Sequence, residues 1–276
     1  MRTSKAKIML FVIVTYSLSF ICWFIATQNQ GFVYDLELES VFVTFGNFMP
    51  SIVGVVFLLL NNKEVKNKKM IFSFKYFIFS LLLMPFVLLV AYLIGNLLFQ
   101  VEFDSLILPI IFESPLSIFI LIVYFIVLQG PLGEEIGWRS FLLNEMLNEN
   151  KLFKASVFVG LIWAFWHTPK FFMENTIQNE LLMSYGLLAT LIGYTIYTVC
   201  LSVIISWLFY KTNKNIVYVL LFHAMANFSH GLITILTQTS AIIIVLIILL
   251  IITYSISRSS IAKISFNAKM MSADSK

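Results

Sequence analysis

Apolar residues occur along the chain in eight long runs that are separated by short polar or charged segments. A helix needs about 20 consecutive, mostly apolar residues to cross the hydrocarbon core of a bilayer. The pattern therefore predicts eight membrane-spanning helices, at residues 8–27, 41–60, 71–98, 116–133, 152–168, 186–209, 216–236 and 240–256. We interpret the first run as a retained span, since it is too long for a signal peptide and no A-x-A-like site follows it.

Charged residues alternate in sign from one connecting segment to the next. The N-terminal segment is basic, the segment QNQGFVYDLELES is acidic, and NNKEVKNKK is strongly basic. Glu102, Asp104 and Glu113 follow in the next connection, and KTNKN and the tail from Arg258 are basic again. Because cytoplasmic loops are enriched in Lys and Arg, this predicts a multi-pass protein of the cell membrane with both termini in the cytoplasm.

Composition agrees with a membrane location. Hydrophobic residues make up 60% of the 276 residues and charged residues only 12%, against about a quarter charged in a soluble domain. The net charge of +4 is spread over loops and tails, so it gives no reason to expect nucleic acid as a partner. Cys22 and Cys200 lie in different runs and form no disulfide framework. We expect one membrane domain over residues 1–276.

Ionisable residues inside membrane spans are costly and are functional candidates by default. Glu134, Glu135 and Arg139 lie at the end of the fourth run, in GPLGEEIGWRS. Adjacent helical residues point about 100° apart, whereas residues four apart share a face. Glu135 is therefore predicted to pair with Arg139, which leaves Glu134 to act as a general base. The competing interpretation is that both glutamates cap and solvate a helix end after the Gly-Pro break.

Two further polar groups lie in later runs. In WAFWHTPK, Trp163 and His167 are four apart and share a helix face, and a lone His at a helix end is often structural. In FHAMANFSH, His223 and Asn227 form a polar stripe, which either joins helices or polarises a carbonyl group. We interpret His230, three residues beyond Asn227, as structural. The fold class expected is an all-α, polytopic membrane protein with about eight transmembrane helices around a polar intramembrane cavity.

Taken together, the three groups resemble the motifs of the CPBP family, the CaaX-protease and bacteriocin-processing (Abi) intramembrane endopeptidases. Glu134, Glu135 and Arg139 match EExxxR, WAFWH matches FxxxH with Trp163 in the place of Phe, and His223 with Asn227 matches Hxxx(N/B). The resemblance covers about residues 70–250 and implies hydrolysis of a peptide bond within the membrane. It implies that Glu134 and His167 activate a water, that His223 and Asn227 stabilise the oxyanion, and that Glu135 and Arg139 support the site.

We expect no cofactor, although the family has often been described as metal-dependent, and the expected partners are the bilayer and a membrane-associated peptide or protein. The closest alternative is a zinc protease in which Glu134, His167 and His223 bind the metal, although HExxH is absent and Asn is a poor zinc ligand. A non-catalytic bacteriocin self-immunity protein is a second alternative. A solute or proton transporter is a third, but the paired repeats that it would need are not found. The Lys, Asn, Ile and Phe bias is typical of a low-GC bacterium, which favours processing of a peptide or leader, or self-immunity, over prenylated substrates.

Hydropathy raises one difficulty with this site. It places Glu134 at the cytoplasmic end of its span and His167 toward the far end of the next, roughly 24 Å away along a helix. We expect the fourth helix to continue past the Gly-Pro break through FLLNEML, which brings Glu134 deeper into the membrane. Positive-inside counting places the 134–151 loop in the cytoplasm, so it also predicts a cytoplasmic opening of the cavity.

Overall fold

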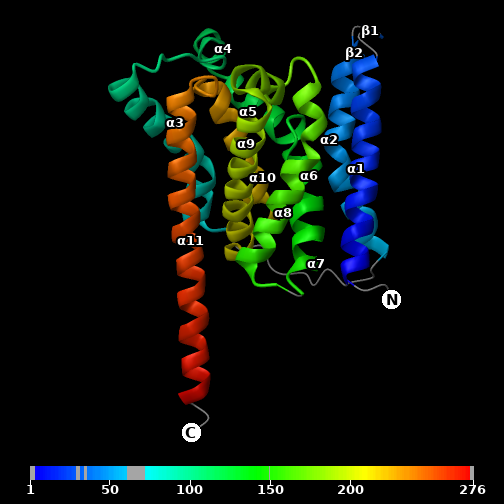
Figure 1. Cartoon of the computed structure of the whole chain (residues 1–276), viewed down its shortest axis with the longest axis vertical. Coiled ribbons are helices and arrows are strands. Elements are labelled where there is room, and N and C mark those ends of the chain that lie inside the picture. Colours follow the sequence, from blue (N-terminus) through cyan, green and yellow to red (C-terminus); the bar gives the residue numbers. More distant parts are fainter. Residues whose placement is uncertain (1–3, 29–31, 34–35, 61–71, 149, 274–276) are drawn as a thin grey trace.

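The computed structural model describes residues 4–28, 32–33, 36–60, 72–148 and 150–273, and side chains within 4–28, 39–60, 72–148 and 150–258. Helices stand side by side in one bundle, with the N-terminus at one end and the β1–β2 hairpin at the other (Figure 1). Each of the eight predicted runs contains a helix, so the prediction of a polytopic all-α membrane protein is confirmed.

The first half of the chain supplies three long helices and the connection that follows them. Helix α1 is joined to α2 by a two-stranded antiparallel hairpin, and α3 is followed by the short α4. The bounds are α1 (Ser4–Gln28), β1 (Phe32–Val33), β2 (Leu36–Glu37), α2 (Leu38–Leu60), α3 (Phe74–Phe99), α4 (Leu108–Glu113) and α5 (Ser117–Val127).

The second half carries the polar residues. The π-helical segment η1 lies between α6 and α7, and the 3-10 turn η2 follows α8. The bounds are α6 (Pro131–Glu135), η1 (Ile136–Leu143), α7 (Asn144–Met146), α8 (Leu152–Trp166), η2 (Thr168–Phe172), α9 (Ile177–Lys211), α10 (Ile216–Leu232) and α11 (Thr239–Ala273).

Among the described residues, six helical segments are long and apolar enough to cross a membrane. They are Ser4–Gln28, Glu39–Leu60, Phe74–Phe99, Ser117–Met146, Ile177–Lys211 and Thr239–Arg258. The two other predicted spans are shorter helices, α8 with 15 residues and α10 with 17. Large apolar side chains cover the outside of the bundle, as in Leu97, which is 81% exposed. This surface suits contact with lipid rather than with water.

The fourth span continues past the Gly-Pro break, as predicted. Helix α5 ends at Val127, Gly130 adopts a φ of 109° that favours glycine, and α6 begins at Pro131. The helical path then runs through η1 and α7 to Met146. The hydropathy boundary at 133 is therefore wrong, because the polar residues of GEEIGWRS lower the mean hydropathy in the middle of a helix.

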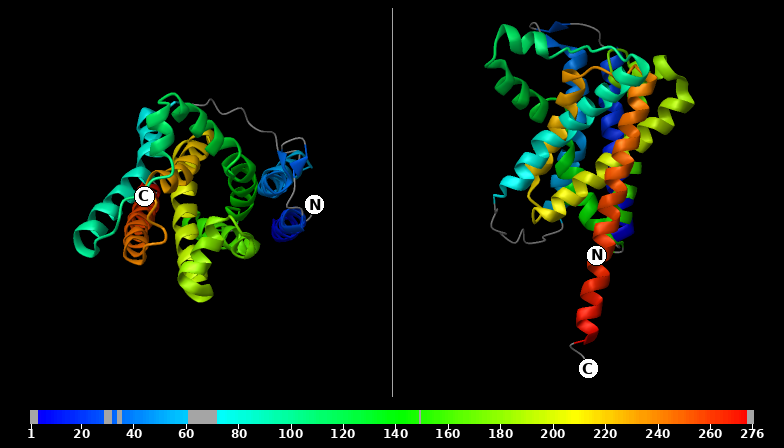
Figure 2. Two further views of the ribbon diagram at one scale, coloured as in Figure 1. Left: turned by 90° about the horizontal axis from the view of Figure 1, so that it is seen from above. Right: turned by 90° about the vertical axis from the view of Figure 1, so that its left-hand side faces the viewer.

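Helices α2 and η1 approach each other closely through glycine. A Cβ added at Gly137 would lie 2.2 Å from the carbonyl oxygen of Pro50, and one added at Gly54 would lie 2.7 Å from the Cα of Gly137. On the other side of the bundle, α8 and α10 each pack against α9, and α10 and α11 each pack against α3. Figure 2 shows α11 extending beyond the other helices at the end of the bundle that holds the N-terminus.

Candidate active site

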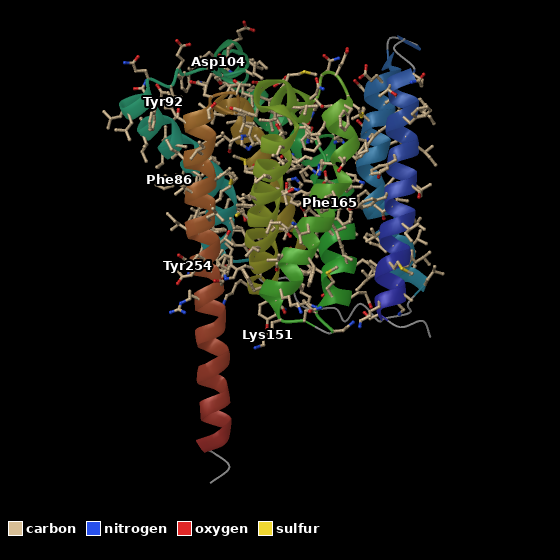
Figure 3. The ribbon with its side chains drawn as sticks, in the orientation of Figure 1. Phe86, Tyr92, Asp104, Lys151, Phe165 and Tyr254 are labelled. Atoms are coloured by element: carbon tan, nitrogen blue, oxygen red, sulfur yellow. The ribbon has the colours of Figure 1, made fainter. Side chains whose placement is uncertain are left out.

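A cavity of about 1170 Å³ lies between the helices, lined by residues of α2, α5, α6, α8, α9, α10 and α11. Its wall includes Glu134, His167, His223 and Asn227, four residues that the sequence analysis selected, together with Trp163. Phe165, near the end of α8, lies between the two ends of the bundle (Figure 3). The selected side chains therefore meet inside the bundle and not at its surface.

Glu135 forms the centre of a buried charged network. Its Oε2 lies 3.1 Å from Nε of Arg139, and its Oε1 accepts a hydrogen bond of 2.7 Å from Nδ1 of His223. Glu135 and Arg139 are both 0% exposed. The predicted Glu135–Arg139 pair is confirmed, and the bond from Glu135 to His223 links α6 to α10 across 88 residues of sequence. The guanidinium of Arg139 also stacks over Trp163, 4.8 Å from the ring centre.

Glu134 faces the cavity on the neighbouring side of the helix. Its Oε2 accepts a hydrogen bond of 2.5 Å from the indole Nε1 of Trp163, and no described residue forms an ion pair with it. Glu134 is 3% exposed. The interpretation of Glu134 and Glu135 as solvated helix-end acids is therefore wrong, because the continued helix buries both. Sequence reasoning missed the role of Trp163 as a donor, although the indole in place of Phe was the available signal.

His167 closes the end of α8 and turns its ring toward the cavity. Its Nδ1 lies 2.9 Å from the carbonyl oxygen of Trp163. A carbonyl oxygen can only accept, so Nδ1 carries the proton and Nε2 keeps a lone pair. The His167 ring lies 4.8 Å from the ring of Trp166 and 5.5 Å from that of Tyr194, which hold its orientation. His167 can therefore accept a proton or a hydrogen bond on its cavity side.

His223 and Asn227 lie one turn apart on α10, as predicted, and both line the cavity. Asn227 Nδ2 donates 2.9 Å to the carbonyl oxygen of Gln129, which ties α10 to the break between α5 and α6. One N–H of the Asn227 amide remains for another acceptor. His230 also lines the cavity, and its Nε2 lies 2.6 Å from the hydroxyl oxygen of Tyr197. Its interpretation as structural stays a prediction.

The zinc alternative names Glu134, His167 and His223 as ligands. Within the described part of the chain, no three His, Cys, Asp or Glu side chains form a group that could hold a metal ion. The Nδ1 atoms of His167 and His223 are each engaged by another group, so Nε2 is the nitrogen of each ring that could still bind a ligand.

The cavity reaches the end of the bundle that carries the β1–β2 hairpin. Its wall includes Glu39, Leu106, Glu174 and Thr237 and none of the described residues of the 144–151 segment. Asp104 and Lys151 mark these two opposite ends in Figure 3. The cavity therefore reaches the end away from the 144–151 segment, because α6 starts in the interior of the bundle and its continuation carries that segment to the far end. The cytoplasmic opening stays a prediction.

Sequence reasoning also missed Lys170, in η2, which lines the same cavity. Hydropathy had ended the fifth span at residue 168 and left this lysine outside it. The signal was a single Lys followed by two Phe residues, directly after the His of the second motif.

The fold and the site define a polytopic membrane protein with a carboxylate, two imidazoles and an amide around one internal cavity. Comparison with known proteins identifies the group. A family model described as "Rce1-like: Type II CAAX prenyl endopeptidase Rce1-like" matches residues 115–229, which include Glu134, His167, His223 and Asn227. The match and the relatives described next support the CPBP family and, with it, a membrane endopeptidase.

Two relatives are similar over most of the chain. The CAAX prenyl protease 2 of Methanococcus maripaludis is 24% identical over 241 residues, which cover 84% of this chain and 87% of the relative. The lysostaphin resistance protein A of Staphylococcus haemolyticus is 27% identical over 226 residues, which cover 80% of this chain and 56% of the relative.

Proposed function

We propose that this protein hydrolyses a peptide bond of a membrane-associated peptide or protein with a water activated by Glu134 and His167. The observation that carries the proposal is the shared cavity, which brings the four candidate side chains together from α6, α8 and α10. A general base must lie within hydrogen-bonding distance of the proton that it removes. Glu134 and His167 both line the cavity in which a water and a substrate would meet.

The first step forms a C–O bond between the water oxygen and the substrate carbonyl carbon. Glu134 takes one proton of the water, and the lone pair on His167 Nε2 orients the water by accepting its other hydrogen. Trp163 holds Glu134 through the 2.5 Å hydrogen bond, so the carboxylate is positioned before the substrate arrives. In the second step the C–N bond breaks, and Glu134 returns its proton to the leaving amine nitrogen.

Two residues of α10, His223 and Asn227, would stabilise the oxyanion. Nδ1 of His223 donates to Glu135, so Nε2 is the ring nitrogen left for the oxyanion, and it donates there when the ring carries both protons. The free N–H of Asn227 supplies a second donor. Each such donor is worth about 3–4 kcal/mol in a site shielded from bulk water. Arg139 balances the charge of Glu135 and does not line the cavity.

The experiment measures cleavage of a panel of quenched peptides by the purified protein in detergent, beside Glu134→Gln and with or without a zinc chelator. We expect Glu134→Gln to lose at least about 10²-fold in kcat while binding persists, since general base catalysis contributes about 10²–10⁴-fold. Cleavage should be unchanged by the chelator. Loss of activity on chelation, with recovery on adding zinc, would contradict the proposed mechanism in favour of the metalloprotease.

A second candidate function follows from the staphylococcal relative, whose name describes resistance to lysostaphin. A non-catalytic immunity protein of the same fold would need the cavity but not the base. If the parent and Glu134→Gln protect cells against lysostaphin equally, the non-catalytic role is favoured. Loss of protection in Glu134→Gln would show that protection depends on proteolysis.

A further inference from the structure

Lys170 is a buried cation in the wall of the cavity. Its side chain lies in η2, three residues after His167, and the residue is 8% exposed. The backbone holds it in place, because its N–H donates 2.9 Å to the carbonyl oxygen of His167 and its own carbonyl oxygen accepts 2.6 Å from the hydroxyl of Thr176. The backbone of Lys170 is therefore fixed relative to the candidate base.

The neighbours of the ammonium group are mainly aromatic. Nζ lies 4.9 Å from the ring centre of Trp23 and 5.8 Å from that of Trp166. Glu134 lies within electrostatic range, but no carboxylate of a described residue forms an ion pair with Lys170. Cation–π contacts contribute less than an ion pair at a site shielded from water. A charge buried in this way lacks its usual compensation.

The charges around the cavity are strongly asymmetric. Glu39, Glu174 and Glu180 line the cavity, whereas Lys170 is the sole Lys or Arg among the described residues that line it. An anion in the cavity therefore meets repulsion from these glutamates and attraction from Lys170, which lies three residues after His167. This arrangement suits a ligand that carries one negative charge on a mostly neutral or basic chain.

We propose that Lys170 binds a carboxylate of the peptide substrate and so selects which peptide bond reaches Glu134. The selection of a scissile bond rests on the proposed function, whereas carboxylate binding by Lys170 can be measured without cleavage. The carboxylate is either the C-terminal group of the substrate or the side chain of an Asp or Glu near the scissile bond. Both make the same charge-assisted hydrogen bond with an ammonium group.

The binding test uses the full-length protein in detergent as Glu134→Gln, so that peptides are not consumed. Three pools of dansylated hexapeptides, matched in sequence, are compared: one with a free C-terminus, one amidated, and one amidated with an internal Asp. Energy transfer from tryptophan to dansyl reports binding, since Trp23 and Trp166 adjoin Lys170. We expect at least one carboxylate pool to bind about tenfold tighter than the uncharged amidated pool, and the pool that does so identifies the source.

Substitutions of Lys170 test whether this residue causes the tighter binding of carboxylate peptides. Lys170→Met in the same background should abolish the preference, and Lys170→Arg should retain it because the positive charge remains. Lys154→Met is the matched control, since Lys154 is exposed and also lies over an aromatic ring, 5.7 Å from the centre of Phe158. Equal binding of all three pools in the Glu134→Gln protein, or a preference that survives Lys170→Met, would overturn the proposal.

Cleavage kinetics distinguish carboxylate binding by Lys170 from the proposed protease activity. In the otherwise unchanged protein, Lys170→Met should raise KM for a cleaved carboxylate peptide about tenfold, with a smaller effect on kcat. A protein that prefers the carboxylate pools but cleaves none of them would contradict the proposed protease activity and still support carboxylate binding at Lys170. A KM unchanged by Lys170→Met would count against Lys170 as the selecting residue.

Discussion

Trp163 contacts several groups of the candidate site. Its indole donates to Glu134, the guanidinium of Arg139 stacks over its ring, and its carbonyl oxygen accepts from His167. The ring also lies 5.1 Å from that of His223. Phe, the usual residue at this position of the motif, would keep the ring contacts but could not donate a hydrogen bond to the carboxylate. In this chain the indole therefore helps to position the proposed base.

Trp163→Phe should lower kcat for peptide cleavage about tenfold, because Glu134 loses the donor that orients it and a hydrogen bond to a charged group is worth roughly 1.5–3 kcal/mol. KM should change little, since the ring remains. Steady-state kinetics on one cleaved peptide measures both constants. Trp207→Phe is the control, as the indole nitrogen of Trp207 has no hydrogen-bond partner among the described residues. Unchanged kcat in Trp163→Phe would show that Glu134 does not need this donor.

At the scale of elements, sequence periodicity predicted the helices better than their ends. The sixth run was predicted to begin at residue 186, whereas α9 begins at Ile177. Gly186 interrupts this helix with a φ of 73° and ψ of 168°, and the residues before it include the polar Gln178, Asn179 and Glu180. The hydropathy window therefore detected the kink instead of the beginning of the helix.

The site could be predicted as a set of residues but only partly as a set of contacts. The Glu135–Arg139 pair follows from the four-residue helical spacing, so sequence alone was sufficient. The Glu135–His223 bond joins residues 88 apart, and the Trp163–Glu134 bond joins residues 29 apart. Both depend on how separate helices pack, which the pattern along one helix does not contain.

The close contact of α2 with η1 makes Gly137 a sensitive position, because it sets where the neighbouring Glu134 and Glu135 lie. Gly137→Ala should destabilise the protein by about 1–3 kcal/mol or more, since its methyl group would overlap the Pro50 backbone. Gly193→Ala should have almost no effect on stability, because the nearest atom to its Cβ, Leu246 Cδ1, would lie 4.0 Å away. Thermal unfolding in one detergent compares them, and equal melting temperatures would contradict this packing.

At the scale of the whole molecule, a basic end of the bundle lies opposite the end that the cavity reaches. Lys151 and the N-terminus lie at one end of the bundle, whereas the cavity reaches the end marked by Asp104 (Figures 1 and 3). If the basic end faces the cytoplasm, as positive-inside counting predicts, the cavity faces the other side of the membrane. A substrate would then be exported, or be inserted in the outer leaflet, before it is cut.

Labelling of single cysteines measures this orientation. In a background with Cys22→Ser and Cys200→Ala, Glu174→Cys should react with a membrane-impermeant maleimide on intact cells. Lys151→Cys should react only after the cells are permeabilised, because it lies at the basic end. Both residues are exposed, so accessibility across the bilayer decides the result. The reverse pattern would place the cavity toward the cytoplasm.

The volume of the cavity determines what state a substrate must adopt inside it. Liquid water occupies roughly 30 Å³ per molecule, so 1170 Å³ holds on the order of 40 waters. A helical segment in lipid keeps its backbone hydrogen bonds because no other partner is present there. Inside a hydrated chamber, solvent can replace those bonds, and the segment can unwind at little cost. In the proposed reaction, the chamber would supply both the water for hydrolysis and a place where a helix can become an extended, cleavable strand.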